Sequence, residues 1–118
     1  MMDNLIRGVE ALIQQELAYA RKDHGDTFHS PHEAFGVIAE ELHEAAEMYS
    51  MIHENNKTML NALRFDSPSL LDDACVGLRR AAMLTACELI QVAAMAEKAM
   101  IPDERREKHE YAPCRRSE

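Results

Sequence analysis

The sequence predicts an all-α fold, a subunit resembling a four-helix bundle, and three observations support this. Hydrophobic residues make up 47% of the 118 residues, whereas only 5% are aromatic and glycine and proline number four each. This composition is typical of helical proteins and is sufficient for one core. Apolar residues also recur at alternating intervals of three and four, the pattern of a helix with one buried face. Finally, helix-capping residues precede the apolar stretches.

We expect four helices, over residues 3–23, 30–54, 57–64 and about 70–100. The connector that precedes residue 30 is short, which predicts that the second helix runs antiparallel to the first. The first helix has an expected buried face made of Leu5, Val9, Leu12, Ile13 and Leu17. We expect residues 1–101 to form a single domain and the charged segment 102–118, which lacks an apolar stripe, to be a disordered tail.

The second expected helix has the clearest start signal. Ser30 can cap the free amides, Pro31 suits the first helical position, and Glu33 completes a capping box. The expected buried stripe behind this start is Phe35, Ile38, Leu42, Ala45, Tyr49 and Ile52. Asn55-Asn56 weakens the helix after this stripe, and for the last helix either Ser67 with Pro68 or Ser69 with Asp72 supplies the start.

The formal net charge of −8 argues against a general nucleic-acid-binding protein or a protein of anionic membranes. The three cysteines, Cys75, Cys87 and Cys114, form no CxxC pair, which favours a reducing compartment. No apolar run reaches the length of a membrane span, and the first residues show no signal-peptide pattern. We therefore expect a cytoplasmic protein.

Two acids of the second helix occupy the shoulder of its apolar stripe. Glu41 and Glu44 lie one turn apart there, whereas Glu40 and Glu47 point away from the core. Two neighbouring carboxylates repel each other unless a proton or cation intervenes. A solvated acidic face is the commoner explanation of such a pair, so a second feature is needed to favour a site.

The last helix supplies that second feature. Between Ala86 and Ala96 only Glu88 and Gln91 are polar, and an isolated carboxylate on so apolar a helix is costly. If the two helices pack, the four oxygen-bearing side chains converge, and such clusters suit Mg²⁺ or Mn²⁺. The shortage of polar residues in this stretch also predicts a homo-oligomer.

The run Glu40-Glu41-Leu-His-Glu44 matches the EExxE motif of the MazG-like all-α nucleoside triphosphate pyrophosphohydrolases. The strings HEAFGVIAEELHE and ELIQVAAMA resemble small members of this group, including phage-encoded ones, over roughly residues 28–100. Two features depart from the family pattern. The second motif, ExxD, ends here in Gln91, and the segment between the motifs is longer than usual.

The resemblance implies an enzyme that cleaves a (deoxy)nucleoside triphosphate to the monophosphate and pyrophosphate. Glu41, Glu44, Glu88 and Gln91 would hold Mg²⁺ or Mn²⁺. Glu40 would act with Glu41 in catalysis, either by orienting a water ligand of the metal or by completing its ligand shell. Contacts to the substrate would come from His29, Lys57, Arg64 and Lys98. Members of the group are dimers or tetramers, so a homodimer or homotetramer is implied.

Alternatives from other classes remain open. A non-catalytic helical interaction protein with a degraded metal site would explain Gln91. Glu40-x-x-His43 fits one half of a ferritin-like di-iron site, but no other helix supplies a second ExxH pair. His29-x-x-His32 could suggest zinc, but a third ligand at sensible spacing is missing.

Overall fold

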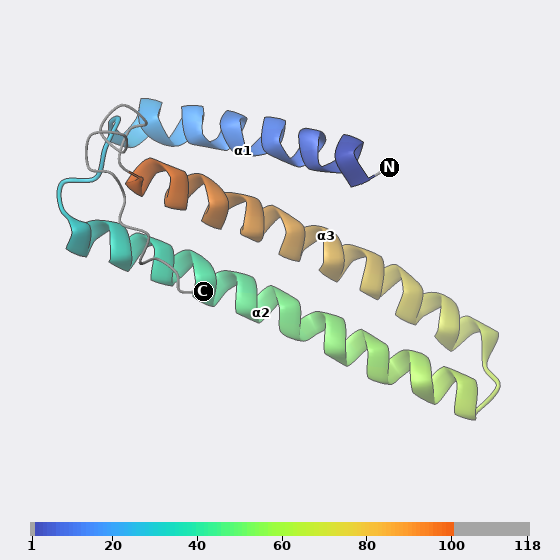
Figure 1. The fold of residues 1–118 in the computed structure, drawn as a ribbon. Coiled ribbons are helices and arrows are strands. Elements are labelled where there is room, and N and C mark those ends of the chain that lie inside the picture. Colours follow the sequence, from blue (N-terminus) through green and yellow to red (C-terminus); the bar gives the residue numbers. More distant parts are fainter. Residues whose placement is uncertain (1, 101–118) are drawn as a thin grey trace, which may run out of the picture.

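The computed structural model describes residues 2–100, and within them every regular element is a helix. Helix α1 spans Met2–His24, α2 spans Pro31–Arg64 and α3 spans Pro68–Ala99 (Figure 1). The all-α prediction is therefore confirmed. The expected disordered tail and Cys114 lie outside the described residues.

The three helices form an elongated, open arrangement with extents of 62 × 32 × 26 Å. α3 packs against both other helices, whereas α1 and α2, within residues 2–100, do not pack against each other. As predicted, α2 runs antiparallel to α1, and α3 returns antiparallel to α2 (Figure 1). The side chains of Gln14 and Glu97 join α1 to α3 through a 3.0 Å hydrogen bond.

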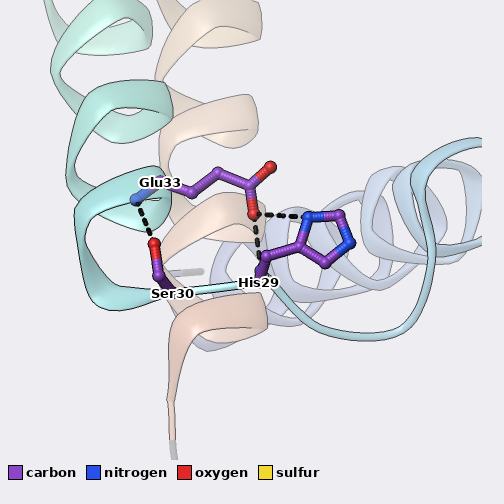
Figure 2. Close-up of polar contacts among 3 residues, drawn as sticks. All are labelled: His29, Ser30 and Glu33. Atoms are coloured by element: carbon purple, nitrogen blue, oxygen red, sulfur yellow. Dashed lines mark hydrogen bonds and ion pairs between the residues drawn. The ribbon is translucent and has the colours of Figure 1, made fainter.

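The predicted capping signals are present at the starts of α2 and α3. The Ser30 hydroxyl accepts the Glu33 amide at 3.0 Å, and the Glu33 carboxylate accepts the amide of His29 (Figure 2). The reciprocal bond of this capping box thus comes from the residue before the cap, and it holds the pKa of Glu33 below its usual range. The start of α3 is set by Ser67, whose hydroxyl accepts the Leu70 amide at 3.2 Å.

The expected break at Asn55-Asn56 is wrong, because α2 continues to Arg64 and the described chain has three helices instead of four. The Asn55 side chain donates a hydrogen bond to the Met51 carbonyl at 2.8 Å and lies against Gly77 of α3. Tertiary packing of this carboxamide therefore compensates for the low helix propensity of asparagine.

The Asn55–Gly77 contact gives a stability prediction. A Cβ atom at position 77 would lie 2.8 Å from Asn55 Cγ, so alanine there must displace the carboxamide. We expect Gly77→Ala to lower the free energy of unfolding by about 1–3 kcal/mol in the wild type. In an Asn55→Ala background the same change should stabilise by about 1 kcal/mol, because alanine is the better helix former. Urea unfolding of the four proteins measures both effects, and an equal effect in both backgrounds would contradict this explanation.

At the contact between α2 and α3 the fully buried residues are small. We use the name seam for one row of buried and half-buried positions on each helix, spaced three or four residues apart. On α2 they are Ala34, Ile38, Glu41, Ala45, Met48, Ile52, Asn55, Met59 and Ala62, and on α3 they are Ala74, Leu78, Ala81, Thr85, Glu88 and Val92. Leu17 of α1 is the only large side chain that is fully buried in the described residues. Small seam residues let the two backbones approach closely but leave little enclosed core.

The predicted buried stripe of α2 is only partly correct. Ile38, Ala45 and Ile52 lie in the seam, but the larger Phe35, Leu42 and Tyr49 are exposed. The side of α2 that faces α3 is therefore rotated away from these three residues, which moves Glu41 from the shoulder into the seam. Most of the expected buried face of α1 is also exposed, including Leu5, Val9 and Leu12.

Candidate metal centre

Three glutamates from two helices meet at one point of the α2–α3 contact. Glu41 and Glu44 come from α2 and Glu88 from α3, and each offers a carboxylate oxygen within 4.8 Å of the others. Glu41 and Glu88 belong to the seam, and Glu44 reaches the same point from one turn further along α2. The convergence predicted for these three residues is confirmed.

Two of these carboxylates have an oxygen without a partner. Glu41 Oε1 and Glu88 Oε1 are buried, and neither has a hydrogen-bond partner. A buried carboxylate oxygen that receives no hydrogen bond is costly and rare in folded proteins. Burial raises the pKa of Glu41 and Glu88, and neighbouring carboxylates, Glu44 for both of them, raise it further.

A divalent cation fits this donor set. No lysine or arginine among residues 2–100 forms an ion pair with the three carboxylates. The donors are all oxygens, which suit Mg²⁺ or Mn²⁺ better than the softer metals that prefer nitrogen and sulfur. Glu41, Glu44 and Glu88 would hold such an ion, and its charge would compensate the two buried oxygens.

A cavity of about 420 Å³ adjoins the cluster and is walled by all three helices. Glu41 and Gln91 contribute to its lining, and so do Phe28 and Lys98. Gln91, the residue that replaces an acid in the second motif, therefore faces the same space as Glu41. Its amide oxygen is available to this cavity without bringing a charge.

Lys98 is the most unusual residue of this cavity. Only 6% of the residue is exposed, and its ammonium lies 4.5 Å from the centroid of the Phe28 ring. A cation over an aromatic face is stabilised by the ring quadrupole, but it forms no ion pair within 4.0 Å in the described structure. Lys98 and Phe28 also line a second cavity of about 570 Å³, beside Arg21.

The other predicted site residues are not members of the cluster, although Glu40 is close enough for its charge to raise the pKa of Glu41. Glu40 is exposed, and the ring of His29 lies 3.5 Å from Glu33 at the start of α2, where it lines the second cavity. Lys57 pairs with Glu54 at 3.5 Å, and Arg64 ends α2. At about 1.5 Å per residue, Lys57 and Arg64 lie about 20 and 30 Å along α2 from Glu44. Within one chain, these two cations therefore do not reach the cluster.

Sequence reasoning missed the contribution of α1 to the cavity. Glu16, Tyr19 and Asp23 line it, and their intervals of three and four place them on one face of α1. That spacing was available in the sequence. This face of α1 could be connected with the site only once α1 was known to pack beside the end of α3.

Comparisons with known proteins give no assignment: no family model, no curated protein and no solved structure matches this chain. Among the helices of residues 2–100, none combines the length and the apolar character needed to cross a membrane.

The raised pKa values predict how the stability of the metal-free protein depends on pH. A carboxyl whose pKa is raised on folding binds more protons in the folded state, so its contribution to stability is complete below the unfolded pKa of about 4.3. That contribution is lost as pH rises through the higher folded pKa. We expect Glu41→Gln to remove part of this decline. Urea unfolding between about pH 4 and 7 in chelator measures it, and identical pH profiles for wild type and variant would contradict it.

Proposed function

We propose that this protein is a Mg²⁺- or Mn²⁺-dependent nucleoside triphosphate pyrophosphohydrolase of the MazG-like type. The observation that carries the proposal is the cluster of Glu41, Glu44 and Glu88, with two buried oxygens that lack partners. The EExxE run supplies two of these glutamates, and a cavity large enough for part of a nucleotide adjoins them. We take the enzyme to be cytoplasmic, where thiols such as those of Cys75 and Cys87 stay reduced.

In this proposal each residue of the site has its own role. Glu41, Glu44 and Glu88 hold the cation, and Gln91 adds an amide oxygen to the same cavity. A bound Mg²⁺ supplies charge neutralisation and polarisation of the phosphoryl oxygens. Glu40, which is exposed beside Glu41, orients the attacking water molecule.

Lys98 fits the nucleoside end of a substrate better than its phosphates. It follows Glu88 by ten residues, which places it about 15 Å further along α3. A lysine side chain cannot span that distance to a phosphate held beside Glu88. Phe28 and Lys98 instead offer an aromatic face and a hydrogen-bond donor, which suit a nucleobase.

The test is a panel of ribo- and deoxynucleoside triphosphates incubated with Mg²⁺, Mn²⁺ or chelator. We expect equal amounts of nucleoside monophosphate and pyrophosphate from at least one of them, and none in chelator. Release of orthophosphate, or intact triphosphates throughout, would contradict the proposal.

A non-catalytic interaction protein is the second candidate, and Gln91 favours it because one acid of the family motif is missing. In that case the protein turns over no nucleotide under any condition of the panel. Gln91→Asp, which restores the acid, distinguishes a weakened enzyme from a protein that has lost the reaction, since only a weakened enzyme gains activity.

A further inference from the structure

The second cavity, of about 570 Å³, lies at the end of the molecule where α1 ends, α2 begins and α3 ends (Figure 1). Arg21, His29 and Lys98 line it, and its wall contains no aspartate or glutamate of the described residues. The whole chain has 21 acidic residues and 13 that are lysine or arginine. The wall of this cavity therefore has the opposite charge to the chain as a whole.

The first cavity, beside the candidate metal centre, differs in charge from the second. Four carboxylates line the first cavity and none of them lines the second, namely Glu16, Asp23, Glu33 and Glu41. Phe28 and Lys98 line both, so they lie between an acidic space and a basic one. An ammonium group has three N–H donors, which allows Lys98 to serve both cavities.

Lys98 is a buried cation without a close anion. Lysine is almost never buried this far unless it is paired, yet no carboxylate of residues 2–100 lies within 4.0 Å of its ammonium. Glu33 is the acid whose pKa the charge of Lys98 helps to lower. The Glu33 carboxylate, however, accepts the His29 amide and lies 3.5 Å from the His29 ring (Figure 2). The charge of Lys98 is therefore available to a ligand.

Arg21 and the start of α2 add positive charge to the same wall. Arg21 lies in the last turn of α1, where its carbonyl accepts the Gly25 amide at 2.9 Å as the helix ends. Its guanidinium is not engaged in an ion pair with any carboxylate in the part of the chain that the structure describes. Ser30 and Pro31 also line the cavity, and they mark the positive end of the dipole of the 34-residue helix α2.

We propose that the second cavity binds a phosphate group between Lys98 and Arg21, either as inorganic phosphate or as the phosphate ester of a small molecule. Two permanent cations match the charge of a phosphate dianion, whereas a carboxylate would leave one of them uncompensated. The guanidinium fork also suits two phosphate oxygens.

This phosphate site is separate from the candidate metal centre. Lys98 lies about 15 Å along α3 from Glu88, so a triphosphate held by the metal does not place its phosphates in the second cavity. Phosphate binding here depends neither on a metal ion nor on the proposed cleavage of nucleotides.

The test is calorimetric titration of the full chain with inorganic phosphate in the presence of chelator. We expect one phosphate per chain and an affinity about fivefold lower for Arg21→Gln. Lys22→Gln is the matched control, since Lys22 is also exposed and in the last turn of α1 but does not line the cavity. It removes the same charge and should change the affinity by less than about twofold. Absence of saturable binding to the wild type, or equal weakening by both substitutions, would overturn the proposal.

Lys98→Met tests the buried cation directly, because it removes the charge and keeps a long side chain. We expect a loss of affinity of at least about tenfold, together with loss of the phosphate-induced rise in melting temperature. A folded Lys98→Met that binds phosphate as the wild type does would overturn the proposal. If this variant does not fold, the comparison of Arg21→Gln with Lys22→Gln decides.

Two further titrations identify the source of the phosphate and separate this site from the metal centre. Tighter binding of glycerol 3-phosphate than of inorganic phosphate would assign the cavity to an ester, and equal or weaker binding would assign it to the free ion. Glu41→Gln should bind phosphate as the wild type does, because Glu41 does not line this cavity. Phosphate binding that is lost in Glu41→Gln would place the anion at the metal centre and overturn the proposal. Nucleotide cleavage without phosphate binding would contradict this site alone, and phosphate binding without cleavage would contradict the proposed enzyme alone.

Discussion

Glu41→Gln should reduce nucleotide cleavage by at least about a thousandfold while leaving the protein folded. Glu41 is central to the cluster, because it lies in the seam with Glu44 and Glu88 around it. An amide of the same shape cannot supply the negative charge that a cation requires. Burial already raises the pKa of Glu41, so loss of its charge should leave the metal-free fold as stable as the wild type or more stable. Pyrophosphate release and the melting temperature, measured on the same samples, test both parts.

Glu47→Gln is the matched control for this experiment. Glu47 lies on the same helix, is exposed, and pairs with His43 at 3.3 Å instead of facing the cluster. Its substitution should change the rate by less than about twofold, because an exposed pair contributes little. Full activity of a folded Glu41→Gln variant would show that Glu41 does not hold the cation.

Glu88→Gln should have the largest effect on the response of the protein to metal. A cation that binds only the folded wild type stabilises it by about 2.7 kcal/mol at a hundred times its dissociation constant. For a chain of this length each kcal/mol raises the melting temperature by about 4–8 °C. We expect Glu88→Gln to abolish most of this rise. The variant should also melt at a higher temperature than the wild type in chelator, because a buried oxygen that lacks a partner is neutralised.

At position 91 the informative substitution adds a carboxylate instead of removing one. Gln91→Asp adds a carboxylate to the cavity that Glu41 lines, so it should increase the metal-induced rise in melting temperature. If instead metal leaves the wild type unchanged and Glu88→Gln lowers its melting temperature in chelator, the cluster is not a cation site.

Local signals in the sequence were sufficient to predict that the chain is helical and where α2 begins. Ser30, Pro31 and Glu33 mark the start of α2, and Ser67 with Pro68 marks the start of α3, because capping depends on residues within one turn. The helix break expected at Asn55-Asn56 was wrong, because the stability of α2 there depends on packing between distant residues. Asn55 is accommodated by Gly77, a contact between residues distant in sequence that no local rule contains.

The site was predicted in part. Glu41, Glu44 and Glu88 could be found because acids on apolar helices are conspicuous. The sequence did not show which face of α2 packs against α3. Ile38, Ala45 and Ile52 lie on one apolar face and Phe35, Leu42 and Tyr49 on its neighbour, and periodicity alone does not say which of the two is buried. The burial of Lys98 could not be predicted from the sequence either, because it depends on where Phe28 lies in the connector.

The most direct test of this account is a Mn²⁺ titration followed by electron paramagnetic resonance, which reports free and bound ion without requiring substrate. The account predicts saturable binding to the wild type and to Glu47→Gln, and loss of that binding in Glu41→Gln and Glu88→Gln. Absence of saturable binding to the wild type, or equal binding to all four proteins, would contradict it.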